Sequence, residues 1–219
     1  MGANRDKEEA RKREAALVSA ITGTKVYLRG VEMADLPRRV EWINDPMIQR
    51  TLNFQYPMSE VKARSWLQAT AADTSRRDFS IYTRETDEYI GFGGLIAIDT
   101  AARKAELYVA IGDKRYWGIG GYGIDAYAVL MRYGFLELGL NRIYGLILPF
   151  NRGSLRIVER LGWSVEGVLR QDLFAHGELR DRTVVSILRS EWLKRQETGT
   201  PTGRPSTRGR RPSKPGDGE

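Results

Sequence analysis

The sequence predicts an α+β domain in which helices interrupt a partly antiparallel sheet. Apolar or alternating runs at 79–83, 92–98 and 105–111 follow one another across turn-forming residues, which is typical of a meander of neighbouring strands. Helical apolar spacing occurs on both sides of this meander, at 34–43 and 124–138. Because strands and helices do not alternate regularly, a repeated βαβ unit is not expected.

Before the meander, residues 26–29 are expected to form a first strand. The helix over 34–43 should end before Asn44-Asp45-Pro46, because proline disfavours helix at the residue that precedes it. Ser59 is expected to cap a second helix that buries Val61, Ala63, Trp66 and Leu67. Trp42, Trp66, Phe79 and Tyr82 are expected to lie in the core or to line a site.

After the meander, the helix over 124–138 should end at Gly139, and a strand is expected over 142–148. A short helix with Leu155, Ile157, Val158 and Leu161 on its apolar face should stop at Gly162. Two closing strands, at 164–173 and 183–188, are expected to pair around a turn at His176-Gly177. His176 is the only histidine, and we expect it to be a solvated turn residue.

The charge of the chain is unevenly distributed. The net charge is +7, and residues 193–219 hold seven basic and three acidic residues together with four of the eight prolines. We therefore expect a helical extension over 1–22, one domain over 23–192, and a disordered basic tail over 193–219. The tail is either simply solvated or makes a weak, salt-sensitive contact with RNA or ribosomes.

Several classes of protein are disfavoured by composition. The chain has no cysteine, which excludes disulfides and thiolate chemistry and is typical of a reducing cytoplasm. No secretory signal is visible at the start, and no apolar run approaches the ~20 residues of a membrane-spanning helix. No clustering of potential ligands indicates a metal site, so we expect a cytoplasmic protein with no membrane contact.

The most informative segment is a glycine-rich stretch between an apolar strand and a long helix. Gly118, Gly120, Gly121 and Gly123 leave the backbone N–H groups exposed just before the helix over 124–138. Bare amides and the helix dipole together favour a bound anion at this place. The sequence therefore predicts a phosphate-binding loop.

Two common phosphate binders do not fit this loop. A nucleotide P-loop requires Lys and Ser or Thr after the glycines, and neither follows here. The dinucleotide pattern G-x-G-x-x-G matches Gly118, Gly120 and Gly123. It also needs a carboxylate at the end of the next strand, where this chain has Leu148-Pro-Phe-Asn151. The surroundings of the loop have to decide its ligand.

Three stretches carry a resemblance to a known family. They are Leu28-Arg-Gly-Val-Glu-Met-Ala-Asp-Leu, then Ala105-Glu-Leu-Tyr-Val-Ala-Ile-Gly-Asp-Lys-Arg-Tyr-Trp-Gly-Ile-Gly, and Asn151-Arg-Gly-Ser-Leu-Arg-Ile-Val-Glu-Arg-Leu-Gly-Trp. Together they resemble the GCN5-related N-acetyltransferase (GNAT) superfamily. The likeness is greatest to its branch of ribosomal-protein N-terminal and spermidine acetyltransferases, and it covers roughly residues 24–192. Arg115-x-x-Gly118-x-Gly120 also fits the superfamily pattern.

The resemblance implies a mixed sheet with helices on both faces, splayed between the strands at 105–111 and 142–148. Acetyl-CoA is the implied cosubstrate. Its pantetheine arm would lie along Val109, Ala110 and Ile111, with help from Asn151, which could equally be a helix N-cap. The pyrophosphate would rest on the loop formed by Trp117, Gly118, Ile119, Gly120, Gly121, Tyr122 and Gly123. This loop carries one more glycine than the branch commonly has, at Gly120 or Gly121.

The resemblance also implies direct acyl transfer to a primary amine. Glu106 stands where the branch often has a carboxylate base, although it could instead form a surface pair with Arg103 or Lys104. The tyrosine that commonly protonates the leaving thiolate is replaced by Val158. Ser154 is the candidate substitute, and the alternative is that it is only a small residue in the first turn of a helix.

The acceptor amine is not fixed by the motifs. A protein N-terminal α-amine is our first expectation, and a polyamine or small amino compound, such as an aminoglycoside or amino sugar, is the alternative. The nearly neutral folded part argues slightly against a polycation. A non-catalytic acyl-CoA-binding module is an alternative of another class, and the branch often forms homodimers.

Overall fold

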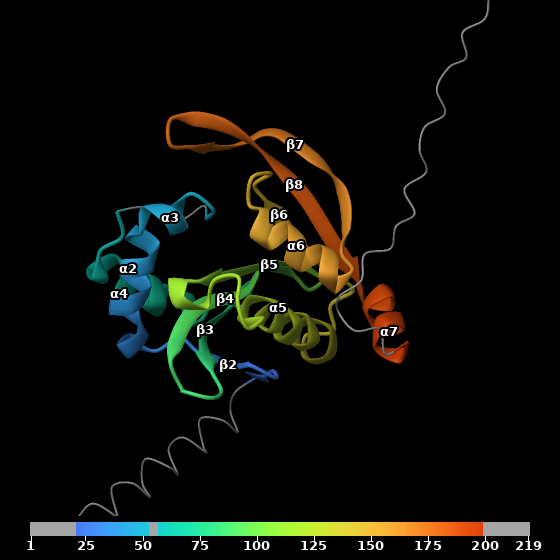
Figure 1. Ribbon diagram of the computed structural model, residues 1–219, viewed down its shortest axis with the longest axis horizontal. Helices are drawn as coiled ribbons and strands as arrows, with labels where there is room; N and C mark the ends of the chain where they lie inside the picture. Colours follow the sequence, from blue (N-terminus) through green and yellow to red (C-terminus); the bar gives the residue numbers. More distant parts are fainter. Residues whose placement is uncertain (1–20, 53–56, 199–219) are drawn as a thin grey trace, which may run out of the picture.

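The computed structural model describes residues 21–52 and 57–198, which form one sheet with helices around it (Figure 1). The strands are β1 (Ile21–Thr22), β2 (Val26–Gly30), β3 (Arg77–Thr83), β4 (Tyr89–Asp99), β5 (Lys104–Ile111), β6 (Arg142–Ile147), β7 (Ser164–Ala175) and β8 (Glu178–Leu188). The helices are α2 (Leu36–Asn44), α3 (Pro46–Gln49), α4 (Glu60–Thr70), α5 (Tyr122–Arg132), α6 (Arg152–Leu161) and α7 (Arg189–Glu197). Shorter turns are the 3₁₀ helices η1 (Met33–Asp35) and η2 (Lys114–Tyr116) and the π-helical turn η3 (Tyr133–Glu137).

The described strands form an eight-stranded sheet in the order β1-β2-β3-β4-β5-β6-β8-β7. Every neighbouring pair is antiparallel except β5 and β6, which are parallel. The predicted meander corresponds to β3, β4 and β5. The mixed α+β class is therefore confirmed, with the single parallel pair at the centre of the sheet.

The two faces of the sheet carry separate apolar clusters. Helices α5 and α6 contribute to the larger cluster, in which Leu107 of β5 and Leu130 of α5 are both buried. On the smaller cluster, Trp42 of α2 packs with Phe92 of β4 and Ala110 of β5. Because successive side chains of a strand point to opposite faces, odd-numbered residues of β5 face α5 and even-numbered residues face α2. Helices on both faces, as predicted, leave β5 covered from either side.

Local signals in the sequence explain the helix ends. The Ser59 hydroxyl accepts the Lys62 N–H at 3.2 Å, which caps α4 as expected. Gly162 ends α6 with φ +83, a conformation that glycine adopts without strain. At the start of α5, the Asp125 carboxylate accepts the N–H groups of Lys25 at 2.7 Å and Val26 at 2.9 Å, so this helix is tied to the beginning of β2.

Some predicted boundaries were wrong. The expected stop at Asn44-Asp45-Pro46 ends α2, but Pro46 also starts the short helix α3, where the Asp45 carboxylate accepts the Met47 N–H at 2.9 Å. The helix expected over 124–138 changes at Tyr133 into the turn η3. Gly139, with φ +62, does end this segment as expected.

The domain limits also differ from those expected. Most of the predicted extension over 1–22 lies outside the described residues, but Ile21 and Thr22 pair with β2 as a strand instead of a helix. Residues 193–197 were assigned to the tail, yet they belong to α7. Burial explains this, because Trp192 packs its ring 5.3 Å from that of Phe135 and Leu193 also contacts the core. Residues 199–219 lie outside the described part of the chain.

Candidate active site

The two central strands separate at Glu106. Parallel pairing of β5 with β6 stops at the Glu106–Tyr144 pair, although β5 continues to Ile111 and β6 to Ile147. The predicted splay between these strands is confirmed. Beyond Glu106, one edge of β5 has no strand beside it, so its backbone groups are open to a ligand on that side.

Glu106 is half-buried and its electrostatic surroundings favour a base. Burial raises the pKa of the Glu106 carboxyl, the charge of Asp172 adds to the increase, and Arg182 opposes it. Arg103, one of its expected surface partners, donates instead to the Gly139 carbonyl at 2.8 Å. A carboxylate with a raised pKa is suited to accepting a proton near neutral pH.

At the open edge of β5, only every second residue turns its backbone N–H and carbonyl groups outward. The carbonyl oxygens of Tyr108 and Ala110 lie against Gly93 and Gly91 of β4, so the backbone groups of these two residues face β4. Because backbone groups alternate along a strand, those of Val109 and Ile111 face the open side. The backbone of Ala110 therefore faces β4, and of the three expected cofactor-binding residues of this strand only Val109 and Ile111 turn their backbone to the open side. The Ile111 carbonyl accepts the indole N–H of Trp117 at 2.6 Å.

The glycine loop has the geometry that its sequence predicts. Gly118, Gly120 and Gly121 have φ values of +69, +64 and +75, a backbone conformation that residues other than glycine rarely adopt. Gly121 is the N-cap of α5, so the helix begins at Tyr122 and its first amides have no side-chain cap. These N–H groups can bind an anion at the positive end of the helix dipole.

Gly123 and the extra glycine have different roles. Gly123 lies in the first turn of α5, and a Cβ there would approach Ile157 of α6 to 3.3 Å, so this glycine permits close packing of the two helices. Gly120 and Gly121 both belong to the loop itself. The additional glycine therefore lengthens the loop before the helix starts and does not interrupt α5.

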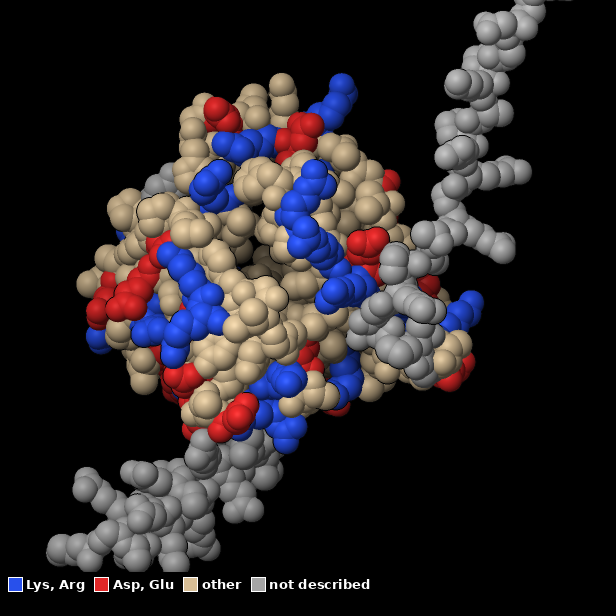
Figure 2. All heavy atoms as spheres, in the orientation of Figure 1, with Lys and Arg blue, Asp and Glu red and all other residues tan. Residues whose placement is uncertain are grey.

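Figure 2 shows a hollow in the middle of the face that Figure 1 presents, where β5 and β6 separate beside α5 and α6. Lys and Arg side chains surround much of its rim. Two of the cations of α6, Arg152 and Arg156, are exposed. A basic rim next to bare helix amides favours a ligand that carries several phosphates.

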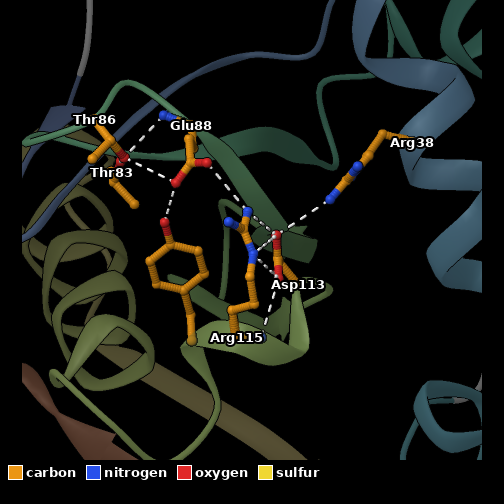
Figure 3. A network of polar contacts seen from close by, with 7 residues as sticks. Arg38, Thr83, Thr86, Glu88, Asp113 and Arg115 are labelled. Carbon is orange, nitrogen blue, oxygen red and sulfur yellow. Dashed lines mark hydrogen bonds and ion pairs between the residues drawn. The ribbon is translucent and has the colours of Figure 1, made fainter.

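A network of charged side chains holds the segment before the loop (Figure 3). The guanidinium of Arg115 lies between Glu88, at 3.2 Å, and the buried carboxylate of Asp113, at 2.7 Å. Hydrogen bonds from Arg115 lower the pKa of Asp113, which keeps this carboxyl ionised. Arg38 of α2 also reaches Asp113 at 3.2 Å, and Tyr116 donates to Glu88. Arg115, although part of the family motif, therefore uses its guanidinium to brace the segment before the loop.

Asn151 and Ser154 lie at the start of α6. The Asn151 side chain accepts the Ser154 N–H at 3.1 Å, so the expected N-cap role is confirmed. The Ser154 hydroxyl interacts with the hydroxyl of Tyr127 on α5, whose pKa burial raises to about 12. Val158, one turn further on, is buried in the core and offers no proton.

Residues that the sequence could not assign also contribute to the site. Tyr144 faces Glu106 across the fork, and burial together with the Glu106 charge raises its pKa. Arg182 and Asp172, which pair with each other on β8 and β7, both act on the Glu106 carboxyl. Strand register brings them together, and no local pattern in the sequence encodes that register.

Of the aromatic residues expected in the core or around a site, only some face the α2 side. Trp42 is buried there, and Tyr82 stacks on Tyr89 with ring centroids 5.2 Å apart. The Arg39 guanidinium lies over the Trp66 ring, with its Cζ atom 4.5 Å from the ring centroid. Phe79 instead packs edge-on against Tyr133 at 5.5 Å, on the side of α5.

Comparison with known proteins decides the family. The family model described as an acetyltransferase (GNAT) domain matches residues 25–164. The chain belongs to the GNAT family of acetyltransferases. It is therefore an acyltransferase enzyme, and acetyl-CoA is its cosubstrate.

The similarity to relatives of this GNAT protein extends over most of each chain. The uncharacterized N-acetyltransferase p20 of Bacillus licheniformis is 32% identical over 172 residues, which is 77% of this chain and 95% of the relative. The spermidine N(1)-acetyltransferase of Escherichia coli K12 is 32% identical over 175 residues, 79% of this chain and 91% of the relative. The structure of a Vibrio cholerae spermidine N-acetyltransferase with CoA and spermine shares the fold, with a TM-score of 0.72 at 24% identity, covering 77% of this chain and 98% of the other.

Proposed function

We propose that this GNAT enzyme transfers the acetyl group of acetyl-CoA directly to a primary amine, with Glu106 as the general base. The observation that carries the proposal is the position of Glu106 at the last paired residue of the fork between β5 and β6. A pantetheine arm that extended along the open edge of β5 would bring its thioester toward this residue. Acetyl-CoA binding would use the backbone of Val109 and Ile111, the loop 117–123 and the side chain of Asn151.

The reaction balances with the groups present. A primary amine is mostly protonated at neutral pH, so Glu106 takes a proton from it, directly or through a water molecule. The amine nitrogen then forms a bond to the thioester carbonyl carbon, and a backbone N–H of β5 stabilises the negative charge that develops on the oxygen. The carbon–sulfur bond breaks and the thiolate of CoA leaves. The second proton that the amine nitrogen loses reaches the sulfur through the Ser154 hydroxyl, which donates one proton to the thiolate and takes up one in return. Glu106 then releases its proton to solvent.

The chemical class of the acceptor amine is proposed from the relatives. The spermidine acetyltransferase among the relatives supports a polyamine, which was the alternative expectation. The first expectation, a protein N-terminal α-amine, rests only on the family resemblance. We therefore propose a small primary amine as the acceptor class, with polyamines as the first compounds to test.

Release of CoA with a panel of amines tests the proposal. The panel should contain spermidine, amino sugars, aminoglycosides and short N-terminal peptides. We expect one class to be acetylated, and Glu106→Gln to lower kcat for it by about 10²- to 10⁴-fold. Glu137→Gln, at an exposed residue of η3, is the matched control and should keep full activity. Equal activity of Glu106→Gln and the wild type would contradict the role of Glu106.

A further inference from the structure

A separate pocket lies beside the candidate active site. Arg50, Phe150, His176 and Arg180 line it, and its volume is about 250 Å³. They come from the end of α3, the segment after β6, the β7–β8 turn and β8, respectively. Figure 1 shows the β7–β8 turn extending toward α3 above the fork, so the hairpin and α3 form opposite walls.

The lining of this pocket is cationic and aromatic. Arg50 forms no ion pair with any residue that the structure describes, and none of the four lining side chains is acidic. The Arg180 guanidinium lies 5.6 Å from the Phe150 ring centre and pairs with Glu178 at 2.9 Å, a residue that is 69% exposed.

One donor of the pocket has no acceptor. The Nε atom of Arg180 is buried and has no hydrogen-bond partner among the described residues. A buried donor without a partner is unfavourable, so it is suited to an acceptor atom that a ligand brings. A carboxylate supplies such an atom and compensates the charge of Arg50, and both guanidiniums can donate to it.

The pocket lies within reach of the reacting amine. Arg180 and Arg182 lie two residues apart on β8, so their side chains leave the same face about 7 Å apart along the strand. Tyr144 pairs with Glu106 on one side and with Ser186 of β8 on the other, so the even-numbered residues of β8, Arg180 and Arg182 included, lie on the face of the sheet that carries Glu106. The charge of Arg182 also acts on the Glu106 carboxyl. Phe150 directly precedes Asn151 at the start of α6. On the wall formed by α3, Ile48 packs with Ala110 of β5, on the face of β5 that also carries Glu106.

We propose that this pocket binds a carboxylate of the acceptor and so selects amines that carry a negative charge at a distance from the amino group. The inference rests on the proposed acetyl transfer and narrows its acceptor class. The volume equals that of about eight water molecules, which suits one acidic side chain. A polyamine would place a second ammonium group against Arg50 and Arg180, so the pocket disfavours it.

Two matched pairs of acceptors test the proposal with the full-length enzyme. The first pair is the peptide amide Ser-Glu-Ala against Ser-Gln-Ala, and the second is 6-aminohexanoate against 6-aminohexanamide. Within each pair only the charge of one group changes. We expect kcat/KM to be about ten- to a hundredfold higher for the carboxylate member of at least one pair, the gain of a charged hydrogen bond. The pair with the larger ratio of kcat/KM, carboxylate over neutral member, shows whether the acceptor is a peptide or a small amino acid.

Variants connect that preference to the pocket. Arg50→Gln and Arg180→Gln should each lower the ratio toward one, and KM for acetyl-CoA should not change. Arg50 is exposed, so its replacement gives the test even where Arg180→Gln reduces stability. Arg64→Gln is the control, because Arg64 lies on α4, is 58% exposed and pairs with Glu60 of the same helix. It should keep the wild-type ratio.

The outcomes separate this inference from the proposed function. Turnover of spermidine or of neutral amines at least as fast as their carboxylate counterparts overturns the carboxylate pocket and leaves acetyl transfer standing. A charge preference that survives in both Arg50→Gln and Arg180→Gln also overturns it. Failure of every amine, spermidine included, to release CoA contradicts the proposed function itself and the pocket with it.

Discussion

At the scale of single residues, Glu106 is under two opposing influences. Its proposed role as the base requires an ionised carboxylate, whereas its half-buried surroundings favour the protonated form. Because the pKa is raised in the folded state, the protonated form is the one that the fold stabilises. Activity and stability should therefore depend on pH in opposite directions at this residue.

A pH series on Glu106→Gln tests this opposition. In the wild type, kcat/KM should rise with pH as Glu106 ionises, with a limb above the ordinary glutamate value of 4.5. The stability that protonated Glu106 contributes is present at low pH and is lost as pH rises through the raised pKa. The melting temperature of Glu106→Gln relative to the wild type should consequently increase between pH 4.5 and 7.5.

The variant should also lose the low-pH limb of the rate profile. A limb that persists in Glu106→Gln belongs to another group, such as the acceptor amine. In that case Glu106 would not be the base.

Ser154 allows a second prediction at this scale. A CoA thiolate needs a proton mainly below the ordinary thiol pKa of about 8.5, so a serine that supplies it matters most at lower pH. We expect Ser154→Ala to lower kcat about tenfold or more near pH 7 and to approach wild-type kcat above pH ~9. An equal loss at every pH would instead indicate that Ser154 only positions α6 through Asn151 and Tyr127.

At the scale of elements, most boundaries of strands and helices could be predicted because the determinants are local. Ser59, Gly139 and Gly162 act through their own backbone surroundings, and each ends or caps the element that was expected. Register is different, since the pairing of Glu106 with Tyr144 depends on residues 38 positions apart in the chain. For this reason the sequence offered Glu106 as a candidate but not the side chains around it.

The same distinction applies to the glycine loop over 117–123. Its glycines and their link to α5 are local, and they were predicted. The network of Asp113, Arg115, Glu88 and Arg38 joins three separate parts of the chain, and it was not predicted (Figure 3). Arg115 illustrates this, because the motif match gave its position but not the two carboxylates, Glu88 and Asp113, to which its guanidinium donates.

A glycine substitution tests the loop as an element. In Gly120→Ala the new Cβ would lie 2.4 Å from Cε2 of Tyr122, and φ of +64 would be strained by about 1–2 kcal/mol. We expect the Kd for CoA, measured by calorimetry, to rise about tenfold or more. Gly167→Ala is the control, because no atom lies within 4 Å of its Cβ position and its φ is ordinary. Unchanged CoA affinity in Gly120→Ala would show that the pyrophosphate does not depend on this loop.

At the scale of the whole molecule, much of the excess positive charge lies outside the folded domain. The tail beyond the described residues carries Arg204, Arg208, Arg210, Arg211 and Lys214, whereas the described domain mixes both signs of charge. None of the described helices is long and apolar enough to cross a membrane. The contact with RNA or ribosomes that the sequence leaves open is therefore a prediction about the tail and not about the domain.

Two truncations separate the tail from the domain. Ending the chain after Thr198 should leave the melting temperature and acetyl transfer unchanged and should remove any salt-sensitive binding to RNA. Ending it after Leu193 instead cuts α7, in which Arg195 donates to the Arg160 carbonyl at 3.3 Å, and the turn that holds Trp192 against Phe135 loses its support. We expect the shorter chain to melt several degrees lower, by roughly 4 °C for each kcal/mol lost. Equal melting temperatures for the two chains would show that the domain ends at 192, as its sequence predicts.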